Sequence, residues 1–150
     1  MLSKSLTVVL LIVIASFNTA SAQLYKQAAG IRVGSTTPAI KTGITYRHFL
    51  NESNAIEGII SLTDGAGICA LYELHKPTTI ENLNWFYGAG GYIAGSNKTT
   101  YVGGAGIIGL DYLFPQVPIN LSLDWKPELN IVERLYFEGT TFGFSIRYAF

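Results

Sequence analysis

The last eleven residues of the chain alternate strictly between two kinds of side chain. Residues 140–150 read T-T-F-G-F-S-I-R-Y-A-F, with aromatic and aliphatic side chains on one face and small or charged ones on the other. A period of two predicts a β-strand. A strand with such an aromatic-rich face needs an apolar surface to cover it, and a lipid bilayer is one such surface.

The first residues indicate export. Lys4 precedes a short apolar run over residues 6–15, and Ala20-Ser21-Ala22 is a small-x-small cleavage site. This pattern predicts a secretory signal peptide over residues 1–22 and one mature domain over residues 23–150. The alternative is an uncleaved anchor helix, but the run is short for a membrane span and no stop-transfer flank follows it.

The composition favours a membrane barrel. Only 13% of the 150 residues are charged, and the mean hydropathy is +0.31, whereas about a quarter of a soluble domain is charged. The mature sequence has no apolar run of transmembrane-helix length. Alternating strands closed into a barrel would place their apolar side against lipid. The formal net charge of +0 gives no electrostatic reason to expect a nucleic-acid partner.

Eight alternating segments are separated by turn-type residues. The predicted strands cover residues 28–35, 40–50, 54–63, 67–76, 84–95, 100–114, 119–126 and 137–150. The fifth strand carries aromatic residues on both faces, so its phase stays open, and residues 127–136 are predicted to form the longest loop. The expected fold is all-β, a closed up-and-down antiparallel eight-stranded transmembrane β-barrel.

An eight-stranded barrel has an interior that side chains can fill. The phase of the strands turns a set of charged residues inward, where charges have to be paired. We therefore expect a structural charge network in the lumen rather than a general acid and base, because a filled lumen admits no substrate. Its predicted members are Arg32, Lys41, Arg47, Lys126 and Arg147, with Glu57, Glu73, Asp111, Asp124 and His75.

Two turns predict a register for part of this network. Three-residue turns at 51–53 and 64–66 would place Arg47 opposite Glu57, and Glu57 opposite Glu73. Two adjacent carboxylates repel each other unless a second cation approaches or one carboxylate takes a proton. Lys126 and Arg147 are the candidate cations, and the sequence leaves open which carboxylate would be protonated.

Other chemistry has little support in the sequence. His48, His75 and the single Cys69 lack the spacing of metal ligands, so we expect no metal and no cofactor. The glycines at 88–91 and 103–109 lack the context of a phosphate-binding loop. We expect them to permit curvature and close packing instead.

The signal peptide, the eight alternating strands and the terminal Tyr148-Ala149-Phe150 together resemble the small eight-stranded barrels of the Gram-negative outer membrane, the OmpA-like and OmpX-like class. The resemblance implies a monomeric barrel in the outer membrane, in contact with its lipid. It also implies that Tyr148 and Phe150 act as the signal that the barrel-assembly machinery recognises.

The expected function is a non-catalytic integral barrel with a structural or interaction role. One alternative is a lipid-modifying enzyme of the lipid A deacylase or acyltransferase type, which would need a base and a nucleophile together near the outer surface. The chain has no His-x-Ser, and both histidines fall near the predicted periplasmic ends. The second alternative is a soluble lipocalin-like barrel, which would carry apolar residues inside and polar ones outside.

Overall fold

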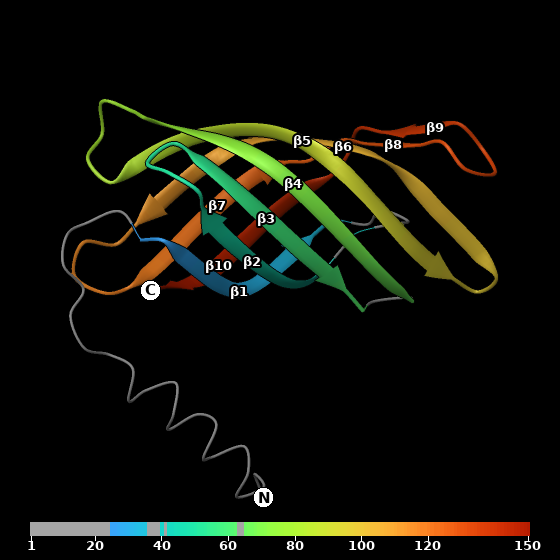
Figure 1. Ribbon diagram of the computed structural model, residues 1–150, viewed down its shortest axis with the longest axis horizontal. Coiled ribbons are helices and arrows are strands. Elements are labelled where there is room, and N and C mark those ends of the chain that lie inside the picture. The colour runs from blue at the N-terminus through green and yellow to red at the C-terminus, as the bar shows by residue number, and fades with distance from the viewer. Residues whose placement is uncertain (1–24, 36–39, 41, 63–64) are drawn as a thin grey trace, which may run out of the picture.

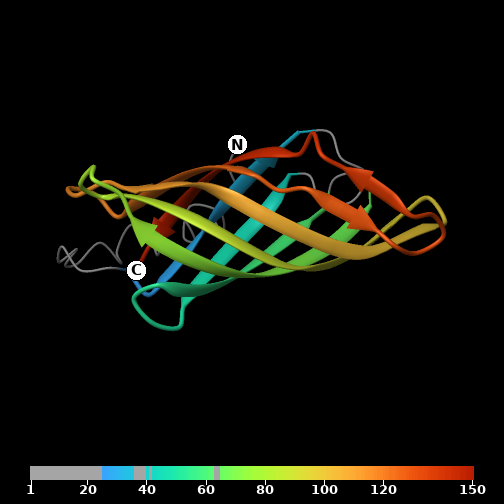
Figure 2. The same cartoon turned by 90° about the horizontal axis from the view of Figure 1, so that it is seen from above.

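The computed structural model describes residues 25–35, 40, 42–62 and 65–150, which form a closed antiparallel barrel (Figures 1 and 2). The signal peptide predicted over residues 1–22 lies outside the described residues, as does Lys41. No helix in the described part is long and apolar enough to cross a membrane. The strands are β1 Gln27–Gly34, β2 Gly43–Phe49, β3 Asn54–Ser61, β4 Ala66–Pro77, β5 Leu83–Ser96, β6 Thr99–Leu113, β7 Ile119–Trp125, β8 Glu128–Asn130, β9 Tyr136–Glu138 and β10 Phe142–Ala149.

Consecutive strands pair from β1 to β7, β8 pairs with β9, and two long-range pairings of β10 close the ring. β1 pairs with β10 from Ala28↔Ala149 to Gly34↔Gly143, and β10 pairs in turn with β7. All of these pairings are antiparallel. The predicted all-β, closed, eight-stranded up-and-down barrel is confirmed for the described residues, with β7–β8 and β9–β10 each serving as one wall strand.

The predicted loop at 127–136 is partly wrong, because strand pairing continues through it. β6 pairs with β7 and β8 in a single register, with Ile108 opposite Trp125 and Ala105 opposite Glu128. Pro127 interrupts the ladder because proline has no backbone N–H to donate. On the other side, residues 139–141 lie opposite only residues 126–127, so a β-bulge joins β9 to β10.

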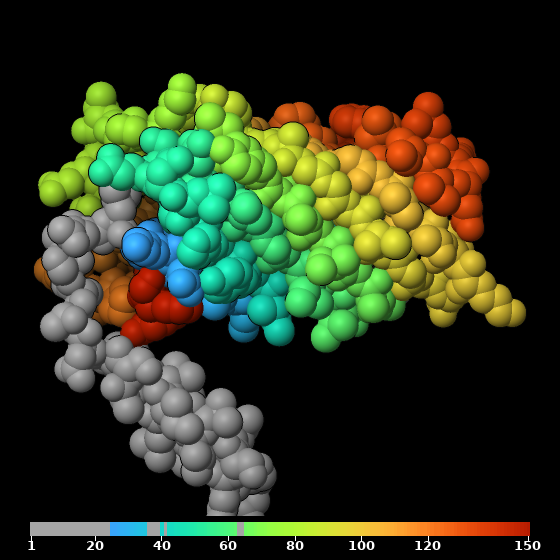
Figure 3. Space-filling model, viewed as in Figure 1, coloured from blue at the N-terminus to red at the C-terminus, as the bar shows by residue number. Residues whose placement is uncertain are grey.

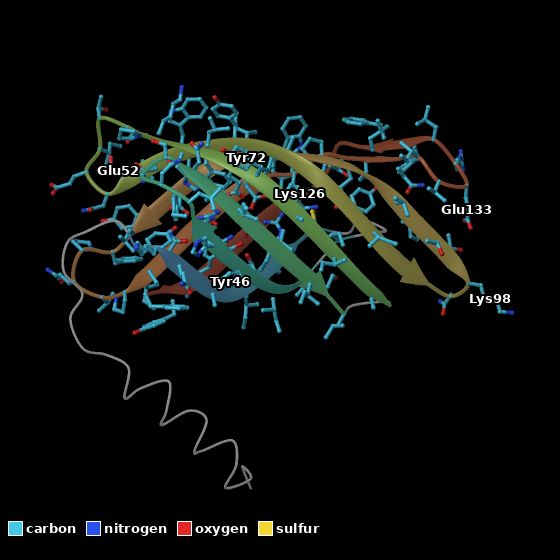
Figure 4. All side chains as sticks on the ribbon, in the orientation of Figure 1. Tyr46, Glu52, Tyr72, Lys98, Lys126 and Glu133 are labelled. Carbon is cyan, nitrogen blue, oxygen red and sulfur yellow. The ribbon has the colours of Figure 1, made fainter. Side chains whose placement is uncertain are left out.

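The two ends of the barrel differ. One end, called the terminal end, holds Tyr25, Phe150 and the turns at 50–53, 78–82 and 114–118. The opposite end, called the loop end, holds the turns at 97–98 and 131–135. β5 and β6 have 14 and 15 residues, whereas β1–β3 have seven or eight. The β5–β6 and β8–β9 hairpins therefore project at the loop end, where Figure 4 labels Lys98 and Glu133 (Figures 3 and 4).

The wall is apolar outside and polar inside. Leu123 of β7 is 58% exposed on the outer face, whereas the next residue, Asp124, is 3% exposed and points into the lumen. The same alternation continues along β10, whose Phe144 is exposed and whose Ser145 is buried. The structure also assigns the phase of β5, which the sequence left open, since Phe86 and Tyr92 are buried inside.

Glycines on the inner face stand beside the largest interior side chains. A methyl group on Gly109 would lie 2.8 Å from Phe86 Cζ and 2.5 Å from the Leu123 carbonyl oxygen. At Gly143 it would lie 2.1 Å from Arg32 Nη2. These glycines make room for a ring or a guanidinium in a narrow lumen, which is a specific form of the close packing predicted from the sequence.

We expect Gly109→Ala to lower the free energy of unfolding by about 1–3 kcal/mol, because the added methyl group must displace the Phe86 ring or the β7 backbone. The measurement is a urea titration of the refolded barrel in detergent micelles, followed by tryptophan fluorescence. Gly104→Ala is the matched control, since a methyl group there meets only the Gly90 carbonyl oxygen at 3.7 Å. Equal stability of the two variants would contradict the packing role of Gly109.

Candidate functional site

Arg47 is the central residue of the buried charge network. Its side chain is fully buried, and three carboxylates from three different strands surround its guanidinium. Nη2 lies 3.1 Å from Glu57 Oε2, Nε lies 3.0 Å from Glu73 Oε2, and Nη1 lies 2.7 Å from Asp111 Oδ1. A planar guanidinium suits this role because its donors point outward in several directions at once.

Glu57 links Arg47 to a second buried arginine. Its Oε1 pairs with Arg147 Nη2 and also accepts a hydrogen bond from the Thr45 hydroxyl. Arg147 Nη1 donates to Ser122 Oγ at 2.7 Å and to Asn120 Oδ1 at 3.2 Å. Neutral hydroxyl and amide groups thus complete the arginine's hydrogen bonds without adding charge.

One part of the predicted register is confirmed and one part is wrong. Arg47 lies directly opposite Glu57. Glu57, however, lies opposite Leu71, and Glu73 lies opposite Ala55. Ser61 pairs with Gly67, so the register of β3 against β4 is shifted by two residues from the predicted one. A shift of two keeps both carboxylates inside the barrel.

Arg147 supplies the second cation for Glu57, and Lys126 pairs elsewhere. Lys126 Nζ forms a buried ion pair with Glu128 Oε1. Sequence reasoning missed Glu128 because it treated the residues after Pro127 as a loop. The signal was present, since the alternation continues through Glu128, Leu129 and Asn130.

A third group joins β1 to β7. The Arg32 guanidinium binds the Asp124 carboxylate in a bidentate pair, with Nη2 to Oδ1 at 2.8 Å. The structure therefore places nine of the ten predicted residues in the lumen, all buried, in three separate groups. The first group consists of Arg47 with Glu57, Glu73, His75, Asp111 and Arg147. The second is Arg32 with Asp124, and the third is Lys126 with Glu128.

Aromatic rings cover the Arg47 group toward the terminal end. The His75 ring stacks on Phe86 at a centroid distance of 4.9 Å and contacts Phe49 at 4.8 Å. Tyr25 packs edge-on against Phe49 at 5.1 Å. His75 Nε2 lies 2.9 Å from Glu73 Oε2. These contacts leave the buried ions without access from this end, so the arrangement is suited to holding strands together.

Farther toward the loop end, the inner face of β3–β6 is apolar, which the sequence analysis did not predict. These strands contribute a buried layer that includes Ile59, Cys69, Leu71 and Ile107. Beyond it, at the loop end, lies a pocket of about 450 Å³. Its walls are Tyr92, Thr99, Tyr101, Glu128, Asn130, Val132, Glu133, Arg134, Tyr136 and Glu138.

Within residues 25–150, as far as they are described, no three His, Cys, Asp or Glu side chains are grouped so as to hold a metal ion. Comparisons with protein-family models, with curated proteins and with solved structures found no match. What the lumen and the pocket do is therefore argued from their geometry.

We expect Asp124→Leu to lower the free energy of unfolding by about 3–5 kcal/mol, because it leaves the Arg32 guanidinium buried without its partner. Adding Arg32→Met to this variant should restore most of the stability, since both charges are then gone and apolar groups replace them. Urea titrations of the two variants and of the wild type, in the same micelles, measure the difference. A double variant as unstable as the single one would refute this account of the pair.

Proposed function

We propose that this protein is a non-catalytic integral β-barrel of the Gram-negative outer membrane, of the OmpA-like or OmpX-like class, with a structural or interaction role. In this proposal residues 1–22 are removed on export, the terminal end faces the periplasm, and the loop end faces outward. The single observation that carries it is the inverted polarity of the barrel, with ion pairs inside and an apolar belt outside.

The belt extends around the wall. Exposed aliphatic or aromatic side chains occur on the outer face of each wall strand, namely Val33, Ile44, Ile60, Ile68, Ile93, Leu110, Leu123 and Phe144. Contiguous apolar patches on soluble monomers rarely exceed a few hundred Å². A belt of this extent supports contact with lipid, and the buried ion pairs are the opposite of the apolar interior of a lipocalin-like barrel.

Aromatic side chains are concentrated toward both edges of the belt. At the terminal end, Trp85 stacks on Tyr87 at 5.2 Å, and Tyr148 stacks on Phe150 at 6.0 Å. Toward the loop end, Trp125 and Phe142 are partnered across β7 and β10. Girdles of aromatic residues at the two membrane interfaces are typical of outer-membrane barrels.

The placement of the histidines supports a non-catalytic role. A lipid-modifying barrel would need its base and nucleophile near the outer surface. His75 is instead buried toward the terminal end between Phe49 and Phe86. His48 lies near the same end, where it is paired with Gln27 and Ile56.

The membrane proposal is tested by a charge on the belt. We expect Leu123→Arg to destabilise the barrel in lipid vesicles by about 2–4 kcal/mol, because the guanidinium would face hydrocarbon. Urea titrations of barrels refolded into vesicles measure this change.

Thr100→Arg is the matched control, since Thr100 is exposed near the β5–β6 tip, and its effect should be at most about 1 kcal/mol. Mature wild-type protein that stays folded and monomeric in buffer without detergent would refute the membrane proposal.

The proposed partner in assembly recognises the C-terminal strand. Phe150 exchanges two backbone hydrogen bonds with Gln27, at 2.8 and 3.0 Å, while its ring is exposed. We expect Phe150→Ala to leave refolding into micelles nearly unchanged, because those bonds do not use the ring.

In cells the same variant should give less assembled barrel, measured as the heat-modifiable band in outer-membrane fractions. Phe144→Ala removes another outward ring from the same strand and is the control. If Phe150→Ala assembles at the wild-type level, Phe150 is not part of the assembly signal.

A further inference from the structure

The pocket at the loop end is not used by the proposed structural role. It lies between the inner faces of β5 and β6 and the β8–β9 hairpin. At this end the hairpins project beyond the short strands (Figures 1 and 3). Its volume of about 450 Å³ falls within the range of about 300–1,000 Å³ that is typical of small-molecule sites.

Hydrogen bonds of the Asn130 side chain hold one wall of the pocket in place. The Asn130 side chain is buried and makes three hydrogen bonds: its Oδ1 accepts from Val102 N at 3.1 Å, and its Nδ2 donates to the carbonyls of Val132 and Arg134 at 2.8 and 3.0 Å. The amide therefore fixes the 131–135 turn against β6. A site formed before binding loses less entropy on binding.

A tyrosine at the floor packs against a glycine. Tyr92 lies opposite Gly103, and a methyl group on that glycine would come within 2.8 Å of the tyrosine hydroxyl oxygen. With Tyr101 and Tyr136, three phenol side chains line one pocket. Aromatic faces carry partial negative charge and attract cations within about 6 Å of the ring centroid.

The charged groups of the pocket add to this negative potential. Three carboxylates line it, from Glu128, Glu133 and Glu138, against the single guanidinium of Arg134. The buried Lys126 neutralises Glu128. Hydrogen bonds from the side chain and backbone of Thr140 and from the Tyr136 hydroxyl hold the pKa of Glu138 below its ordinary value, so that carboxylate is charged at neutral pH.

We propose that this pocket binds an organic cation, with its ammonium group among the tyrosines and its apolar part toward the buried layer below. The negative charge of the pocket disfavours an anionic lipid headgroup, which also separates this site from the lipid-modifying alternative. The inference does not rest on the membrane proposal, because the pocket is defined by its own walls.

The test compares two molecules of the same shape. Benzyldimethyl(2-hydroxyethyl)ammonium and its uncharged carbon isostere, 3,3-dimethyl-4-phenylbutan-1-ol, are titrated into the refolded barrel by isothermal titration calorimetry. We expect the cation to bind at least about tenfold more tightly than the isostere, which is the range of desolvated cation–π contacts. Equal affinities would overturn the proposal.

Variants then locate the binding. Tyr101→Leu should weaken cation binding by about fivefold, and Tyr101→Phe should retain it because the aromatic face remains. Glu133→Gln combined with Glu138→Gln should also weaken it. The controls are Tyr46→Leu on the outer wall and Glu81→Gln in the 78–82 turn (Tyr46 is labelled in Figure 4).

Circular dichroism and heat-modifiable migration establish that each variant is folded before it is titrated. Cation binding that is unchanged in both folded Tyr101→Leu and the folded double glutamine variant would also overturn the proposal, since the cation would then bind elsewhere. Binding lost equally in Tyr101→Phe and Tyr101→Leu would overturn the role of the ring face.

Discussion

The pairing of buried charges around Arg47 is the interaction on which the rest of the barrel depends. The guanidinium of this residue joins carboxylates from β3, β4 and β6, and Glu57 connects the group to Arg147 on β10. The network thus ties together strands that are not neighbours in the sheet. Removing one member leaves another charge without a partner in a closed lumen, where water cannot replace it. Specificity for one register follows, because a slip of one residue would turn these charges toward the outer face.

The narrow lumen imposes a second constraint, which is volume. Large side chains and glycines occur as neighbours, as with Phe86 beside Gly109 and Arg32 beside Gly143. The charged groups occupy the side of the lumen formed by β1, β7 and β10 together with the terminal end, and the apolar layer occupies the side formed by β3–β6. The interior is therefore mixed in polarity, rather than uniformly polar as the sequence pattern alone suggests.

The unequal lengths of the wall strands separate the two candidate roles in space. Toward the terminal end, aromatic rings and ion pairs fill the lumen and suit a structural role. At the loop end, the β5–β6 and β8–β9 hairpins continue beyond their neighbours and enclose the tyrosine pocket. The bulge at residues 139–141 connects the pocket end to the rest of the barrel wall. It lets β9 and β10 form one wall strand although their registers against β8 and β7 differ by one residue.

The sequence by itself determined the class of fold, the inner and outer faces of most strands, and the Arg47–Glu57 pairing. These are local properties, since alternation has a period of two and a short turn sets the register of the hairpin beside it. The sequence misplaced Glu73 because the register of β3 against β4 differs by two residues from the one that the Asp-Gly signal suggested. It missed Glu128 and the pocket because Pro127 resembles a strand end. Only the tertiary structure decided which cation reaches Glu57, since Arg147 is 90 residues away along the chain and meets Glu57 only when the barrel closes.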